Sequence, residues 1–292
     1  MFEILFNIIA PVVFCAGLGF FWSKRGYAFH METISGLVTN VGAPMLIFTT
    51  LVQLKMSLSD FLEFGLMAFY ALASFFVLGF IILKILRLKV RDYIPTIVFP
   101  NVGNMGTPLC FFAFGEAGLT LALAFFAIYA ILQFTVGVWI ASGTGSLTQV
   151  LKTPLVYAVG IALFLKISDI AVPKWIIGTT DLLGGFTIPL MLIALGVSLS
   201  SLSVKHLKLA FLLSILRLGV GFSVGVGLAT LFDLEGVERG VLILECSMPV
   251  AVFNYLIALR YDRPYGQIAG TILVSTLLTF VSLPLLLIFV LP

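Results

Sequence analysis

Three asparagines lie in stretches of the chain that are otherwise apolar, and each lies near a proline. Asn101 and Asn104 precede Pro108, and Asn254 follows a second proline. An amide carries both donors and acceptors, so it can hold and release a polar solute. We predict that these amides bind a substrate together with the hydroxyl of Thr107. The alternative is that they hydrogen-bond backbone groups freed by the prolines, or a neighbouring helix.

One acid, Glu245, lies deep in an apolar stretch, four positions before Pro249. A carboxylate is costly inside hydrocarbon, so an acid at this depth is a candidate functional group. Glu245 could bind and release a proton, or it could contribute an oxygen to a sodium site. It could instead form a buried ion pair with Arg217. For Arg217 we favour an extended side chain that reaches the cytoplasmic interface.

Other polar residues in apolar stretches could line a cavity. Tyr129 and Gln133 are four positions apart, so they share one face of a helix, and Asn40 lies in a similar setting. Hydrogen bonding between neighbouring helices is an equally good interpretation of all three.

The amino-acid composition indicates whether water or lipid surrounds the folded chain. Of its 292 residues, 61% are hydrophobic and 10% are charged, and the mean hydropathy is +1.20. Soluble domains carry about 25% charged residues, so this chain is an integral membrane protein whose main solvent is lipid. The net charge of +3 is too small to indicate nucleic-acid binding.

The sequence contains no arrangement typical of an enzyme or a metal site. Its three cysteines lie in apolar runs without the close spacing of metal ligands, and its two histidines lie in predicted loops. It has no Gly-rich phosphate loop and no pair of membrane-embedded aspartates. We therefore expect no catalytic residue, no metal and no organic cofactor, although a sodium ion or a proton could be coupled to the function.

Ten apolar stretches are each long enough to cross a bilayer, which takes about 20 residues. They cover residues 2–22, 33–53, 61–83, 93–116, 119–141, 153–168, 175–199, 207–232, 237–260 and 265–291. The links between them are short. We therefore predict a single all-α membrane domain, residues 1–292, with ten transmembrane helices.

Lysine and arginine are distributed unequally among the links. Numbered in chain order, links 1, 3, 5, 7 and 9 contain eleven of these residues, and links 2, 4, 6 and 8 contain four. Because positively charged links are retained in the cytoplasm, this distribution places both termini outside it. We expect a multi-pass protein of the cell membrane, the inner membrane in a bacterium.

Similar segments recur at a spacing close to half the chain length. The matching pairs are residues 11–17 with 154–160, residues 43–47 with 188–192, and Pro108 with Pro249. We predict two repeats, residues 1–146 and 147–292. Five helices per half is an odd number, so the second repeat must enter the membrane from the opposite side.

The fourth and ninth stretches, 93–116 and 237–260, are equivalent in the two repeats, and both contain prolines that interrupt a helix. Freed backbone groups persist in a membrane only where protein or a wet cavity surrounds them. We therefore predict that the two helices cross at Pro108 and Pro249. At such a crossing, half-helix N-termini can bind an anion and C-termini a cation. The alternative is that the prolines simply kink two packed helices.

Four segments of the chain share a pattern with a known family. They are Asn101–Leu109, Ile188–Leu199, Met248–Ala258 and Val274–Leu285. In this combination the chain resembles the auxin efflux carrier family, in particular the bacterial branch of the PIN-like transporters. The resemblance covers essentially the whole chain. It does not extend to the long cytoplasmic loop of the plant members, because the link at 142–152 is short.

This resemblance implies ten helices in two inverted repeats, with the fourth and ninth helices crossed. Helices 1, 2, 6 and 7 would form a scaffold domain that also dimerises, and helices 3–5 and 8–10 would form a transport domain. The wider fold is similar to that of the bile-acid sodium symporters, in which the crossing also holds cations.

From the residues and the resemblance we expect a transporter of a small organic anion, an auxin-like carboxylate or a dicarboxylate, working by elevator-type alternating access. The alternatives are a sodium- or proton-coupled organic-acid symporter and a sensor that binds its ligand without moving it. The expected partners are the organic anion, the lipid bilayer and a second copy of the chain.

Overall fold

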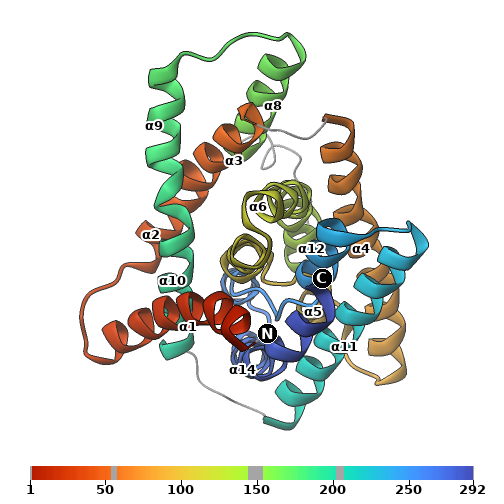
Figure 1. The fold of residues 1–292 in the computed structure, drawn as a ribbon. Helices are drawn as coiled ribbons and strands as arrows, with labels where there is room; N and C mark the ends of the chain where they lie inside the picture. Colours follow the sequence, from red (N-terminus) through yellow and green to blue (C-terminus); the bar gives the residue numbers. More distant parts are fainter. Residues whose placement is uncertain (1, 54–57, 144–153, 202–206, 292) are drawn as a thin grey trace.

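The computed structural model describes residues 2–53, 58–143, 154–201 and 207–291, and most of the link 142–152 lies outside these ranges. Within them the chain forms α-helices and three π-helices, joined by turns, and no strand (Figure 1). The all-α class predicted from the sequence is therefore confirmed for the described part of the chain.

The helices follow one another closely along the chain. In the first half they are α1 (Phe2–Lys24), α2 (Met31–Leu37), the π-helix η1 (Val38–Gly42), α3 (Ala43–Val52), α4 (Leu58–Ile85), α5 (Val90–Val98), the π-helix η2 (Val102–Gly106), α6 (Thr107–Leu132), the π-helix η3 (Gln133–Gly137) and α7 (Val138–Ser142). In the second half they are α8 (Pro154–Ile167), α9 (Lys174–Gly185), α10 (Thr187–Ser201), α11 (Leu207–Leu231), α12 (Gly236–Cys246), α13 (Phe253–Arg260) and α14 (Tyr265–Val290).

Six helical segments of the described part are long and apolar enough to cross a membrane. They are Phe6–Lys24, Leu62–Ile85, Val102–Leu132, Lys174–Ser200, Leu207–Leu231 and Tyr265–Val290, and two shorter apolar helices are Asn40–Val52 and Val156–Ile167. Many large apolar side chains on these helices are exposed on the outside of the molecule. Such a surface suits lipid rather than water, so the chain is a multi-pass membrane protein.

The two stretches expected to contain a break are both interrupted. The stretch 93–116 is divided into α5, η2 and the first part of α6, and the stretch 237–260 is divided into α12 and α13. Helix α6 then bends at Gly115, whose φ of 64° lies in the left-handed region that favours glycine. This bend coincides with the end predicted for the fourth apolar stretch.

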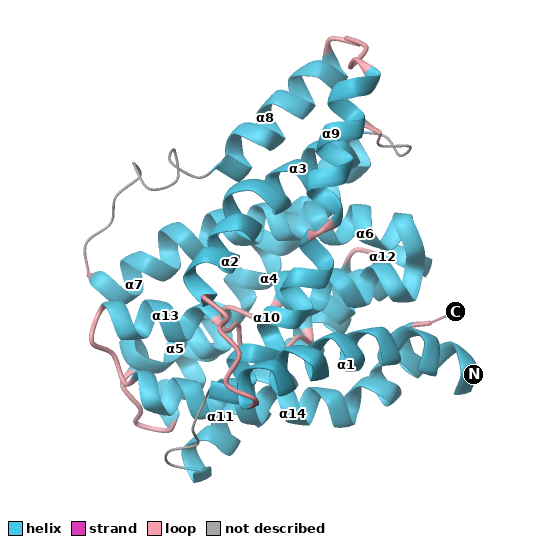
Figure 2. Ribbon diagram, turned by 90° about the vertical axis from the view of Figure 1, so that its left-hand side faces the viewer, coloured by secondary structure: helices cyan, strands magenta, loops and turns pink. Residues whose placement is uncertain are grey.

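The helices pack in two groups. In the first, α1 packs along α10, and α3 packs against α8 and α9. In the second, α11 contacts α4, α12 and α14, while α6 contacts α4 and α12. Figure 2 shows α3, α8 and α9 together at one end of the molecule. The groups meet where α1 and α10 contact α6 and where α10 contacts η2, so η2 lies at their boundary.

Glycines allow α1 and α10 to approach closely. A Cβ atom added at Gly19 would overlap the carbonyl of Ile193, and one added at Gly196 would overlap the carbonyl of Ala16. Small residues at helix contacts are typical of membrane proteins, where van der Waals packing drives the association of helices. The pair α1 and α10 therefore depends on the absence of side chains at these two positions.

We expect the Gly19→Ala variant to lose about 1–3 kcal/mol of unfolding free energy, the cost of overpacking a tight contact. The matched control is Gly17→Ala on the same helix, because a Cβ atom at Gly17 would meet no atom within 4 Å. Melting temperatures of the purified variants in detergent measure the difference. If both variants melt at the wild-type temperature, the close contact of α1 with α10 is contradicted.

Candidate functional site

The two interrupted helices meet at their unwound segments, which pair with each other; we call this region, with the residues packed around it, the crossing. The N–H of Asn101 donates to the carbonyl of Pro249 at 2.7 Å, and the N–H of Ala251 donates to the carbonyl of Phe99 at 3.0 Å. Together they form an isolated antiparallel bridge between Pro100 and Val250. Each segment thus supplies the hydrogen-bond partners that the other lost when its helix was interrupted.

Prolines explain where the helices stop. Pro100 and Pro249 have no N–H, so neither can continue a helical hydrogen-bond pattern, and both lie in the paired segments. Pro108 lies in the first turn of α6, directly after the π-helix η2, and the helical backbone continues through it from Val102 to Leu132. That the helices cross at Pro108 and Pro249 stays a prediction: the paired backbone contains Pro100 and Pro249, while Cys110, two positions after Pro108, lies 3.7 Å from Glu245 of α12.

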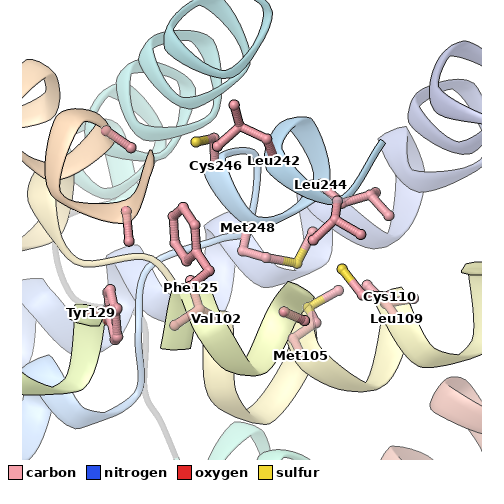
Figure 3. Packing of buried hydrophobic residues seen from close by; sticks show 14 of the residues in the cluster. Val102, Met105, Leu109, Cys110, Phe125, Tyr129, Leu242, Leu244, Cys246 and Met248 are labelled. Atoms are coloured by element: carbon pink, nitrogen blue, oxygen red, sulfur yellow. The ribbon is translucent and has the colours of Figure 1, made fainter. Parts of the chain in front are cut away.

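Apolar side chains surround the crossing and exclude solvent from it. Figure 3 shows part of this cluster from close by; the side chains of Val102, Phe125 and Met248 in it are all fully buried. In such surroundings water cannot replace a missing hydrogen-bond partner, so every polar group at the crossing must find one in the protein or in a ligand.

Asn254 fastens the two halves of the crossing to each other. From its position near the start of α13, its Nδ2 donates to the carbonyls of Pro95 at 3.0 Å and Phe99 at 3.2 Å, at the end of α5. Its Oδ1 accepts a hydrogen bond from Nε2 of Gln133 at 3.5 Å. The amide of Asn254 therefore has the role that we gave as the alternative, which is to bind backbone groups freed by the break.

Tyr129 also binds the unwound backbone. Its hydroxyl donates to the carbonyl of Pro100 at 2.5 Å, and its ring meets that of Phe99 edge to face, with the centroids 6.0 Å apart. Tyr129 and Gln133, predicted to share a helix face, thus both contact the crossing. Both act by hydrogen bonding between segments, the interpretation that was left open beside cavity lining.

Arg217 is fully buried at the crossing. Its guanidinium donates through Nη1 to the carbonyl of Ile97 and through Nη2 to the carbonyl of Cys246. The expectation that Arg217 extends to the cytoplasmic interface is therefore wrong. Its carbonyl partners are 120 and 29 positions away in the chain, and no spacing pattern in the sequence relates such distant residues.

Glu245 is fully buried on α12 and points toward the start of α6. Its Oε1 lies 3.7 Å from the Sγ of Cys110, and its Oε2 has no hydrogen-bond partner. A Cβ atom at Gly106 would overlap the carboxyl group, so the absence of a side chain there makes room for the acid. Glu245 and Arg217 form no ion pair, although both lie among the described residues.

The crossing concentrates polar atoms that lack partners. Five buried side-chain polar atoms of the described residues have none: Asn101 Nδ2, Thr187 Oγ1, Arg217 Nε, Glu245 Oε2 and Ser247 Oγ. All but Thr187 belong to the crossing. Buried polar groups are normally paired, so this concentration marks the crossing as the candidate binding site.

The remaining predicted site residues lie in different settings. Thr107 is buried, and its hydroxyl donates to the carbonyl of Val102 at 3.1 Å, so it stabilises the turn in which it lies. Asn104 is half-buried on η2, whereas Asn40 is exposed on η1. Beside Asn104, a Cβ atom at Gly103 would lie 3.4 Å from the side chain of Met191, so η2 packs directly on α10.

Comparison with known proteins gives consistent matches along the chain. A family model described as membrane transport protein matches residues 4–150 and 143–287. An uncharacterized transporter of Methanocaldococcus jannaschii is 28% identical over 264 residues, which is 85% of each chain. An uncharacterized transporter of Methanothermobacter thermautotrophicus is 29% identical over 268 residues, 87% of each chain. With matches of this extent added to its four sequence motifs, the chain belongs to the membrane transport protein family of the auxin efflux carriers.

Proposed function

We propose that this protein is a secondary transporter of a small organic anion, a mono- or dicarboxylate, and that the anion binds beside the crossing of the interrupted helices. Membership of a transporter family supports the activity. The anion-binding part of this proposal rests on one observation. The helix η2 begins in the protein interior, beside the unpartnered amide donor of Asn101.

The start of η2 offers hydrogen-bond donors to an anion. The first N–H groups of a helix have no partner within the helix, and the helix dipole adds partial positive charge there. In η2 these groups belong to Val102, Gly103 and Asn104. Nδ2 of Asn101 adds a further donor. A carboxylate is the kind of ligand that such an arrangement binds, and we propose that the side chain of Asn104 completes its shell.

We propose that transport is a movement of the second packing group past the first. The first group corresponds to predicted helices 1, 2, 6 and 7, the scaffold, and the second to helices 3–5 and 8–10, the transport domain. The contacts within each group and the position of η2 at their boundary support this division. An anion bound at η2 would then reach either side of the membrane with the moving group, as in an elevator.

The finer architecture is part of the same proposal. We propose ten transmembrane helices in two inverted repeats, residues 1–146 and 147–292, in the cell membrane with both termini outside the cytoplasm. The charge distribution of the links supports this orientation. We also propose a homodimer through the scaffold, and the exposed apolar side chains of Phe164, Trp175 and Leu182 on α8 and α9 offer surface for it.

Proton-coupled symport is a second candidate, and Glu245 favours it. Its carboxyl group is enclosed, has one unpartnered oxygen and lies against the start of α6, next to the proposed anion site. A group in this position can be protonated and deprotonated in each transport cycle if the movement opens it to each side in turn.

A screen for ligands tests the proposed function. The purified protein is heated with mono- and dicarboxylates, such as indole-3-acetate and succinate, because a ligand that binds the folded state raises the melting temperature. The best ligand is then offered to proteoliposomes and to protein-free liposomes. We expect stabilisation and protein-dependent uptake. Stabilisation without uptake would favour a sensor, and neither effect at any pH or sodium concentration would contradict the proposal.

We expect Asn104→Ala to weaken binding of that ligand about tenfold, which corresponds to about 1.4 kcal/mol, as for one lost hydrogen bond. The matched control is Asn7→Ala, because Asn7 is exposed on α1. Ligand-dependent melting curves give both affinities, and curves without ligand show that both variants are folded. If the Asn104→Ala variant binds and transports like the control, η2 is not the anion site.

A further inference from the structure

The side chain of Arg217 joins the ends of two half-helices. Arg217 lies near the middle of α11 and is fully buried. Its guanidinium binds the carbonyl of Ile97 in the last turn of α5 and the carbonyl of Cys246, the last residue of α12. One cationic side chain therefore binds the C-terminal ends of both helices that stop at the crossing.

The charges at this point balance. The C-terminus of a helix carries about −0.5 of an elementary charge, so two such ends together carry about −1, and one guanidinium of +1 matches them. Glu245 is the acid that the fold brings into this region, and it forms no ion pair with Arg217. An uncompensated charge is very costly in an apolar interior, so the helix ends are the groups that compensate Arg217.

The surroundings fit a planar cation. The guanidinium carbon lies 4.3 Å from the centroid of the Phe75 ring of α4, a distance typical of cation–π contacts. Gly221, one turn further along α11, makes room, because a Cβ atom there would overlap the carbonyl of Cys246 and crowd Nη2 of Arg217. Arginine stays charged, and its flat fork of donors can bind two carbonyls at once, as it does here.

We infer that Arg217 is the resident cation of the crossing: its guanidinium fills the place between the two half-helix C-termini that a metal cation such as sodium would otherwise take. A sodium ion added there would put a charge of about +2 against about −1 at the helix ends. The crossing therefore forms without sodium and does not bind it. This inference does not depend on the proposed anion transport, and it leaves the proton as the ion that the crossing can couple.

Melting temperatures in different salts test the inference on the wild-type protein. The purified protein is heated in sodium chloride, lithium chloride and choline chloride at equal ionic strength, without organic anions. We expect the same melting temperature in all three, because the cation site is already filled. A saturable rise that is specific for sodium would overturn the inference, whether or not any anion is ever found to be transported.

Variants of Arg217 test whether the crossing needs the positive charge of this side chain. Arg217→Met keeps the bulk and removes the charge, and it should lower the melting temperature by several degrees, while Arg217→Lys should retain part of the stability. Arg217→Ala leaves space, so millimolar ethylguanidinium should raise its melting temperature but not that of the wild type. Gly219→Ala, where an added Cβ meets no atom, is the control on α11.

Two results with these variants would overturn the inference. One is an Arg217→Met variant as stable as the wild type, because the charge would then be unnecessary. The other is an Arg217→Ala variant that does not respond to ethylguanidinium, because the cation would then have no defined place. Should none of the variants fold, the salt comparison on the wild type still decides the question.

Discussion

The Asn254→Asp variant is expected to lose about 1–4 kcal/mol of unfolding free energy, because it keeps the shape of the side chain and removes the two hydrogen bonds that Nδ2 donates. These bonds hold the carbonyls of Pro95 and Phe99 at the end of α5. No water can replace the donor, and aspartate would set a second acceptor against both carbonyls. The lower value applies if the protein unfolded in the membrane finds other partners for these groups.

The matched control for Asn254→Asp is Asn40→Asp, the same chemical change at an asparagine that is exposed on η1. Melting temperatures, and reversible unfolding in detergent where it can be reached, compare the two variants. A clear loss for Asn254→Asp with little change for Asn40→Asp is expected. Equal melting temperatures would show that the amide of Asn254 does not hold the two halves of the crossing together.

The apolar stretches that contain the helices could be predicted from the sequence because the membrane imposes a single simple requirement. A segment that crosses lipid must be apolar over its length and must pair its backbone internally, so runs of apolar residues and the polar links between them reveal the helices. The bend of α6 at Gly115 lies where one predicted stretch ends. The two interruptions were predicted because prolines in these stretches can interrupt a helix. A proline alone does not decide this, since Pro11 and Pro284 lie inside the continuous helices α1 and α14. The division of two further stretches was not predicted: 33–53 is divided among α2, η1 and α3, and 175–199 is divided between α9 and α10.

The position of the crossing could not be predicted with the same certainty, because the same stretch contains two prolines. Pro100 and Pro108 both lack an N–H, and only the structure distinguishes them: Pro108 starts α6, while Pro100 pairs with the segment after Pro249. Which proline ends a helix and which lies inside one depends on where the backbone finds hydrogen-bond partners, and here the partner segment is about half the chain away.

The roles of the buried polar residues depend on tertiary contacts. The sequence singled out Asn254, Tyr129 and Glu245 because polar groups are rare in apolar helices. It could not show that Asn254 and Tyr129 bind carbonyls of the unwound segment, or that Arg217 does so as well. A cation deep in a helix can extend to the membrane interface, pair with an acid or bind the carbonyls at a helix end. Arg217 binds helix ends, and this choice depends on how α4, α5, α11 and α12 pack around it.

Under proton coupling, the Glu245→Gln variant is expected to lose accumulation of a dicarboxylate driven by a pH gradient, while exchange of the anion across the membrane continues. Glutamine resembles protonated glutamate in size but cannot release a proton. The carboxyl group of Glu245 has one unpartnered oxygen. The titratable groups around it are Cys110 and Tyr129 on α6 and Cys246 on α12. Arg217 on α11 binds the carbonyl of Cys246, the residue that follows Glu245.

Proteoliposomes with an acidic exterior measure this effect, using succinate so that passive entry of a neutral weak acid does not obscure it. With symport, protonation outside and release inside make the wild type accumulate more anion as the exterior becomes more acidic, and the Glu245→Gln variant should show no such dependence. The control is Glu116→Gln, because Glu116 is exposed beside the bend of α6. A Glu245→Gln variant that still accumulates succinate in proportion to the gradient would exclude this acid as the coupling group. Arg217 already binds the helix C-termini and so excludes sodium from the crossing. If Glu245 is excluded as the proton-binding group as well, the crossing is a site for the anion alone, and the protein is a uniporter.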